Sequence, residues 1–166
     1  MKKFFLLLFV MTLPLLSHAQ FKFGYFSYDK ALWSMPEYAV ADANMKDLRR
    51  KYEAEMKRVE EEFNRKYEEF LDGQRDFAPT ILQKRQTELQ ELLKKNVAFK
   101  AESEKLLQQA ETEAFAPLRE KLAKVVQQVG ADRGYAFIIN TDGDACPFIN
   151  PEMGEDVSQI ITEALQ

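Results

Sequence analysis

The chain has 166 residues, with 27 Asp or Glu residues against 23 Lys or Arg residues and a formal net charge of −4 at pH 7. This length suits one domain behind an N-terminal targeting segment. The acidic balance argues against nucleic acid as a partner, because phosphate binding requires a basic surface.

Residues 1–19 have the pattern of a secretory signal. Lys2 and Lys3 precede an apolar run, and Ser17-His18-Ala19 supplies the small residues that a signal peptidase recognises. We predict export with cleavage before Gln20, which leaves residues 20–166 as a single domain with 21 basic and 27 acidic residues. An uncleaved anchor is the alternative, although the apolar run is short for a membrane span.

The exported segment lacks the residues of several common active sites. The single histidine of the chain, His18, would be removed with the signal. The exported segment then has no His base and no Ser-His or Cys-His pair. The glycines occur singly, so there is no phosphate-binding loop. We predict that the protein is not an enzyme and uses no cofactor or metal. Cys146 is the single cysteine, and its strand-like surroundings predict burial, with a disulfide between chains as the alternative.

A calcium loop built from Asn140, Asp142 and Asp144 is the metal site that we considered. Its sixth position is Ala145 where such loops need Gly, and its twelfth is Pro151 where they need Glu. The sequence therefore excludes this site.

The segment from Asp42 to Asp76 is strongly charged, with 20 charged residues out of 35. Its apolar residues recur at spacings of three and four in an eleven-residue pattern, which is typical of a nearly straight helix with one narrow apolar stripe. The stripe consists of Met45, Leu48, Tyr52, Met56, Val59, Phe63, Tyr67 and Phe70. Such a stripe needs a partner, because side-chain pairs on the exposed face contribute only a few tenths of a kcal/mol each.

Residues typical of helix ends divide residues 36–133 into two predicted helices. Ser34 is predicted to cap the first, with Glu37 completing a capping box, and Gly73 to end it. Pro79 begins the second, since proline is tolerated in a first turn. The short connection makes the two helices antiparallel. The seam of the second helix is predicted to contain Leu82, Leu89, Leu93, Val97, Leu107, Ala110, Ala114, Leu118, Leu122, Val125 and Val129.

Two features interrupt the second helix. Lys100 to Lys105 is polar across the predicted seam, so we expect the loosest packing there. Pro117 removes a backbone donor inside the helix and predicts a kink near Glu113.

The two ends of the exported chain are aromatic and β-branched. We predict strands at residues 21–28, 135–140 and 145–149, the last two joined as a hairpin by Asp142-Gly143. A final short helix follows, capped by Asp156 with Gln159. Its apolar face consists of Val157, Ile160, Ile161 and Leu165. The fold class is thus α+β, mainly α: a long antiparallel helical hairpin (a coiled-coil arm, residues 36–133) on a small β body (residues 20–35 and 134–166).

The order of these parts resembles the Skp/OmpH family of periplasmic chaperones. Three segments carry the resemblance: Phe23-Gly-Tyr-Phe-Ser-Tyr-Asp-Lys-Ala-Leu with Met35-Pro-Glu-Tyr, Pro117-Leu-Arg-Glu-Lys-Leu-Ala-Lys-Val-Val, and Gly134-Tyr135 with Ile-Ile-Asn140. Asp156-Val-Ser158 stands where the family has an acidic cap before its last helix. The similarity covers residues 20–166.

This resemblance implies a periplasmic homotrimer with a jellyfish-like architecture, in which three helical arms surround a cavity. Unfolded outer-membrane proteins would be held there without ATP and kept from aggregating. The best-known members are strongly basic, whereas this chain is acidic, so a contact with lipopolysaccharide or an acidic membrane is not expected. A structural or adaptor coiled coil of the periplasm is the alternative function.

Two groups of apolar residues are candidates for binding. Three short strands make a weak sheet alone, so we expect the body to assemble with other copies. The candidate trimer residues are Phe23, Tyr25, Phe137, Ile138, Ile139 and Phe148. The candidate client-binding residues are Phe77, Phe99, Ile81, Phe70 and Phe115. Phe77 is favoured because it falls in the turn, and Phe99 and Phe115 because they lie outside the predicted seam.

Overall fold

The computed structural model describes residues 22–143 and 146–166. The predicted signal, the cleavage position before Gln20, and Phe21, Asp144 and Ala145 lie outside the described residues. Within the described part the chain is mainly helical, with a three-stranded sheet. It divides into two compact units, which we call the arm (residues 36–120) and the body (residues 22–35 and 121–166). Residues 121–133, which the sequence analysis grouped with the helical arm, thus belong to the body.

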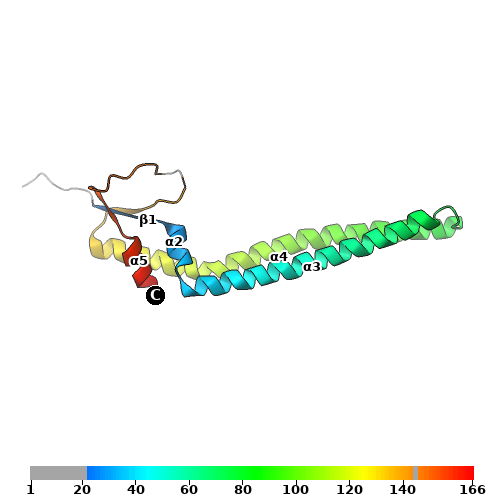
Figure 1. Ribbon diagram of the computed structural model, residues 1–166, viewed down its shortest axis with the longest axis horizontal. Coiled ribbons are helices and arrows are strands. Elements are labelled where there is room, and N and C mark those ends of the chain that lie inside the picture. The colour runs from blue at the N-terminus through cyan, green and yellow to red at the C-terminus, as the bar shows by residue number, and fades with distance from the viewer. Residues whose placement is uncertain (1–21, 144–145) are drawn as a thin grey trace, which may run out of the picture. The chain divides into compact units, whose positions relative to one another are not determined.

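The sheet of the body is parallel throughout. Strand β1 (Phe23–Phe26) lies between β2 (Phe137–Asn140) and β3 (Gly154–Asp156), as Figure 1 shows in part. The register pairs Phe23 with Phe137 on one side and with Gly154 on the other. β1 is therefore the central strand, and both of its partners lie more than a hundred residues away from it in the sequence.

The predicted hairpin between residues 135–140 and 145–149 is wrong. Gly143 does adopt a positive φ of 74°, as a tight turn requires. However, the side chain of Asp142 accepts hydrogen bonds from Ser27 Oγ (2.6 Å) and from the backbone nitrogen of Asp29 (2.8 Å). These bonds anchor the turn to the residues after β1. The chain then leaves the sheet, and the described residues 146–149 form no strand. Consequently Cys146 is half-buried, where a buried strand residue was predicted.

Two short helices complete the body. Ser27 caps α2 (Tyr28–Trp33), and α5 (Ser158–Leu165) packs against α2. Ser34 was predicted to begin the long first helix, but it ends α2, because its hydroxyl donates to the carbonyl of Ala31 at 2.7 Å. The cap position of α5 is Val157, and the predicted cap Asp156 lies one residue earlier, where its carboxylate accepts a hydrogen bond from the nitrogen of Ser158. The buried core of the body consists of Phe26, Ala31, Leu32, Met35, Leu122, Val129, Val157, Ile161 and Leu165.

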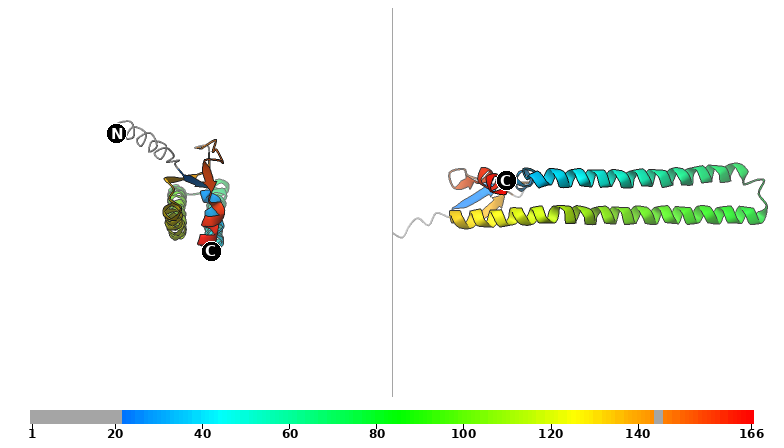
Figure 2. Two further views of the ribbon diagram at one scale, coloured as in Figure 1. Left: turned by 90° about the vertical axis from the view of Figure 1, so that its left-hand side faces the viewer. Right: turned by 90° about the horizontal axis from the view of Figure 1, so that it is seen from below.

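Two long helices form the arm and lie side by side in Figures 1 and 2. Helix α3 (Pro36–Gly73) ends at the predicted glycine, and α4 (Pro79–Arg133) begins at the predicted proline and continues into the body. The apolar stripe of α3 is confirmed as its less exposed face, except that Tyr67 is exposed. α4 is continuous through Pro117; the kink stays a prediction.

Candidate binding surfaces on the arm

The arm helices meet along a seam in which successive residues of α3 contact residues of α4 in reverse order. The paired residues are Tyr38 with Phe115, Arg49 with Glu111, Tyr52 with Phe99 and Val59 with Asn96. The first pair is a ring contact at 5.1 Å between centroids, and the last is a hydrogen bond of 3.0 Å from Asn96 Nδ2 to the carbonyl oxygen of Val59. A polar residue therefore occupies a position of the seam on α4.

An apolar depression, which we call the mid-arm groove, lies beside this hydrogen bond. Its volume is about 250 Å³. Apolar side chains of both helices line it, together with Asn96: Met56, Val59 and Phe63 from α3, and Leu93 and Val97 from α4. Glu60, Asn64 and Lys100 complete its lining. One acidic and one basic residue leave the groove without a net charge.

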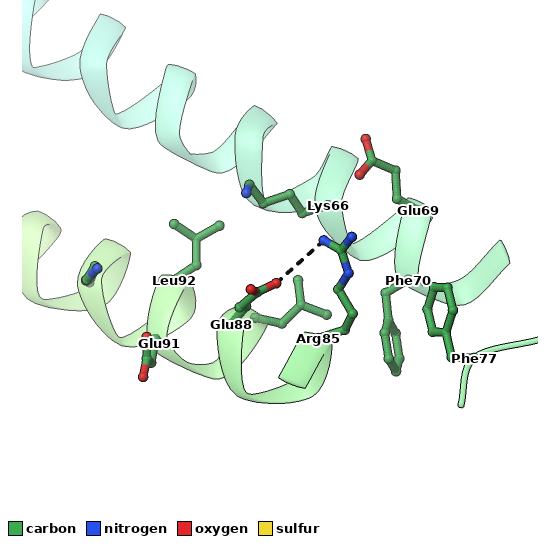
Figure 3. A pocket seen from close by; sticks show the side chains of 10 residues that line it. Lys66, Glu69, Phe70, Phe77, Arg85, Glu88, Glu91 and Leu92 are labelled. Carbon is green, nitrogen blue, oxygen red and sulfur yellow. Dashed lines mark ion pairs between the residues drawn. The ribbon is translucent and has the colours of Figure 1, made fainter. Parts of the chain in front are cut away.

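A second depression, the tip groove, lies at the end of the arm and has a volume of about 410 Å³ (Figure 3). Arg85 forms an ion pair with Glu88 there, with 3.5 Å between Nη1 and Oε2. Phe70 and Phe77 lie next to each other at the same end in Figure 3. Six charged residues line this groove: Lys66, Glu69, Arg85, Glu88, Glu91 and Lys95. Phe70, Phe77, Leu89 and Leu92 complete its lining. It is thus a mixed surface in which charged residues, with equal numbers of acids and bases, outnumber apolar ones.

Helical periodicity places the two grooves on opposite sides of the seam. Successive residues of an α-helix are rotated by about 100°. Relative to Asn96, Leu93 and Val97 are turned to one side, and Leu92 and Lys95 to the other. The first two line the mid-arm groove and the latter two line the tip groove. One face of the arm is therefore apolar near its middle, and the opposite face is charged near its end.

Comparison with known proteins assigns the fold to a family. A family model described as outer membrane protein (OmpH-like) matches residues 22–165. The chain belongs to this OmpH-like family. A crystal structure of a candidate outer membrane chaperone (OmpH-like) from Caulobacter crescentus CB15 matches with a TM-score of 0.66 and 18% sequence identity, covering 86% of this chain and 82% of that chain. At this identity the likeness shows the fold. No curated protein matches.

Two of the predicted client-binding residues of this OmpH-like chain lie at the end of the arm. Phe77 was expected to be free in the turn, but its ring lies over Gly73 and 6.5 Å from the ring of Phe70. A Cβ atom on Gly73 would approach Phe77 Cζ to 2.5 Å, so glycine is what permits this close packing. Both rings are half-buried, and Phe77 closes the end of the arm instead of projecting from it.

Phe99 and Phe115 were predicted to lie outside the seam, and both placements are wrong. Phe99 packs against Tyr52, with 6.4 Å between ring centroids. Phe115 is 8% exposed and packs against Tyr38. Phe115 is therefore buried, and Phe99 is half-buried in the seam.

The seam of α4 differs from the predicted one because a polar residue takes the place of an apolar one. Asn96 faces α3 through its hydrogen bond to Val59, so Val97 is turned outward and is 62% exposed. Leu93 is exposed as well. Leu93 and Val97 were both predicted to lie in the seam, because the seam positions of α4 were chosen by hydrophobicity. The eleven-residue spacing of α3, continued along α4, selects the observed positions instead: Leu92, Asn96, Phe99, Ser103, Leu107, Ala110 and Ala114.

Ile81 is exposed, as expected of a residue that contacts clients. It does not line either groove described above. Of the five predicted residues, Ile81 is therefore the one whose side chain is largely open to solvent.

Ser103 overturns the prediction of loose packing between Lys100 and Lys105. It is 2% exposed, and among the described residues its Oγ atom finds no hydrogen-bond partner. The small side chain fits a tight part of the seam, where the neighbouring positions 99 and 107 are half-buried. A buried hydroxyl without a partner is destabilising.

Five of the candidate trimer residues lie in β1 and β2, and the sixth, Phe148, lies in the segment between β2 and β3. The rings of Phe23 and Phe137 are stacked at 5.4 Å, and Phe137 is exposed. Phe148 is 77% exposed. Tyr25, Ile138 and Ile139 are half-buried within the chain itself. Phe137 and Phe148 thus have the most surface available to another chain.

Two groups of polar residues in the body form hydrogen bonds next to the sheet, one around Asp142 and one around Glu155. The hydrogen bonds from Ser27 and from the backbone of Asp29 lower the pKa of Asp142 below its ordinary value. On the other side of the body, Glu155 accepts hydrogen bonds from Tyr135 and from Arg133. Burial, reinforced by the bond to Glu155, raises the pKa of Tyr135 to about 12. These hydrogen bonds join segments of the body that are distant in the sequence.

Within residues 22–143 and 146–166, no group of three or more His, Cys, Asp or Glu side chains is arranged to hold a metal ion. The helices in the same part of the chain include none with enough length and apolar character to cross a membrane.

Proposed function

We propose that the protein is an ATP-independent holdase of the periplasm, which binds unfolded outer-membrane proteins and keeps them from aggregating. Three chains would assemble through their bodies, and their antiparallel helical arms would surround the client. The proposal involves binding without catalysis. Membership of the OmpH-like family supports it, as does the sequence pattern of a secretory signal at residues 1–19.

The observation that carries the proposal is the surface of the arm. Its helices expose separate apolar side chains among charged ones: Val40, Tyr67, Leu71, Ile81, Leu93, Val97 and Leu106. A soluble protein avoids one large apolar patch, which would cause self-association. Isolated apolar contacts distributed along an arm can still hold an unfolded chain, because many weak contacts act at a high effective concentration.

The sheet supports assembly through the body. In the described chain β2 and β3 each pair only with β1, so both are edge strands. Open edges invite pairing with another chain, and Phe137, Phe148 and Met153 are exposed on the same unit. We expect Phe148→Asp to reduce the mass in solution from a trimer to a monomer without loss of helix content, as measured by light scattering and circular dichroism. A wild-type protein that is monomeric at micromolar concentration would contradict this assembly.

The function is tested by diluting a urea-unfolded outer-membrane β-barrel into buffer with increasing amounts of the mature protein. We expect turbidity to fall as the trimer approaches the concentration of the client, with or without ATP. Aggregation that continues at a large excess of the protein would refute the holdase function.

A further inference from the structure

We propose that the mid-arm groove binds one large apolar side chain of an unfolded segment, while Oδ1 of Asn96 accepts a hydrogen bond from that segment's backbone. The inference rests on the proposed holdase function and identifies one surface that does the holding. It replaces the aromatic residues favoured by the sequence analysis with a groove formed by both arm helices.

The groove brings together apolar side chains of both helices, whereas the other exposed apolar residues of the arm stand among charged ones. Five apolar side chains line it, and two of them, Leu93 and Val97, are exposed in the chain as it stands. A single exposed aliphatic residue is common on protein surfaces and does not indicate a binding site. Here, however, the exposed residues of α4 join Met56, Val59 and Phe63 of α3 in one depression. Covering them would remove apolar surface from water without disturbing the seam.

Asn96 gives the groove a side-chain hydrogen-bond acceptor. The carbonyl of Val59 is an acceptor, so the amide nitrogen of Asn96 must face it, at 3.0 Å. Oδ1 is then directed away from that carbonyl, and Asn96 also lines the groove. A folded helix or sheet has few backbone N–H groups to spare, because nearly all are paired internally. An unfolded segment has such groups at every residue except proline, so this acceptor favours unfolded chains regardless of their sequence.

The size of the groove also favours an unfolded segment over a folded partner. A cavity of about 150 Å³ can hold one benzene molecule, so 250 Å³ is enough for one large side chain. A stable interface between folded proteins buries about 1,200–2,000 Å², which a groove of this size cannot provide. With Glu60 and Lys100 as its charged members, the groove does not select for the charge of the segment either.

The tip groove is larger but is a poorer candidate. Four apolar residues line it, but so do three acids and three bases, and Arg85 is already paired with Glu88. Burying six charged residues under an apolar segment carries a desolvation cost, which is smaller at the mid-arm groove with its one acid and one base. This difference between the two grooves leads us to place the apolar contact at the middle of the arm.

The first test compares two valines with the same exposed fraction in the full mature protein. Val97 lies in the groove and Val40 does not, and each is 62% exposed. We expect Val97→Ser to weaken binding of a urea-unfolded outer-membrane β-barrel by about threefold to tenfold, because part of a buried valine contact is lost. Val40→Ser, which removes at most one of the many weak contacts of the arm, should change the affinity by less than about twofold. Equal affinities of the two variants would overturn the proposal.

The second test isolates the hydrogen bond. The probe is a soluble Gly- and Ser-rich peptide containing Phe, compared with the same peptide N-methylated on its backbone. N-methylation should weaken binding to the wild-type protein by about twofold to tenfold and should have no effect on binding to Asn96→Leu. An equal loss for both proteins would show that Asn96 does not accept this bond. Melting curves of Asn96→Leu establish that the arm remains folded.

The outcomes separate this inference from the function on which it rests. If the wild-type protein does not protect the unfolded barrel, the holdase function fails. If it protects and Val97→Ser protects equally well at limiting protein, the function stands and the groove assignment fails. A change in assembly mass caused by Val97→Ser would show that a second copy of the chain covers the groove, which also overturns the inference.

Discussion

In the body, Val157 and Ile161 are completely excluded from solvent, whereas the one buried residue of α3 in the arm, Met45, is still 8% exposed. The body and the arm both contain apolar residues. The body gathers them in one core, whereas the strongly charged arm distributes them along a narrow seam. Burial in a dense core gives each side chain a large share of the stability. In the arm each contact contributes less, and apolar surface remains available for binding.

Replacement of one core residue in each region should give the largest contrast. Ile161→Ala removes a fully buried side chain from the body and should cost about 2–5 kcal/mol of unfolding free energy. Val59→Ala removes a half-buried one from the arm and should cost less than about 1.5 kcal/mol. Urea unfolding followed by circular dichroism measures both. Similar losses would mean that the arm is packed as tightly as the body.

Replacing Ser103 tests whether a buried hydroxyl without a partner lowers the stability of the arm. Ser103→Ala removes a buried hydroxyl that has no partner among the described residues, so we expect it to stabilise the arm by about 1 kcal/mol. Thr87→Ala, which removes an exposed hydroxyl of the same helix, is the control and should change stability by less than about 0.5 kcal/mol. A loss of stability in Ser103→Ala would show that this hydroxyl is satisfied in solution.

The smallest effect is expected at the turn that anchors the sheet of the body. The pKa of Asp142 is lowered in the folded protein, so its ionised carboxylate stabilises the fold above the ordinary pKa of 3.8. This contribution disappears as the pH falls through and below that value. Asp142→Asn, which keeps a carbonyl acceptor but has no charge, should show a shallower decrease in melting temperature between pH 5 and pH 2.5. Identical slopes for wild type and variant would exclude this role.

The long helices could be predicted because their signals are local. The stripe of α3, its end at Gly73 and the start of α4 at Pro79 follow from spacing and from the backbone preferences of glycine and proline. The sheet could not be predicted in the same way. Asp142-Gly143 is a strong hairpin signal, but hydrogen bonds to Ser27 and Asp29, far away in the sequence, decide where the chain goes next.

The binding surface could be predicted only in part, because one polar residue decides which face of α4 is exposed. Hydrophobicity alone favours Val97 in the seam, whereas the hydrogen bond from Asn96 to the backbone of Val59 turns Val97 outward. Phe99 and Phe115 then pack inside the arm. A strict eleven-residue spacing would have found this arrangement, because it takes no account of side-chain polarity.

The central claim is that the assembled protein holds unfolded outer-membrane proteins, and the mass of the complex tests it most directly. Size-exclusion chromatography with light scattering would be performed on the mature protein alone and after mixing with a urea-unfolded β-barrel. We predict the mass of a trimer in the first case and of a trimer with one client in the second. A monomer, or a trimer that leaves the client to aggregate separately, would contradict the account.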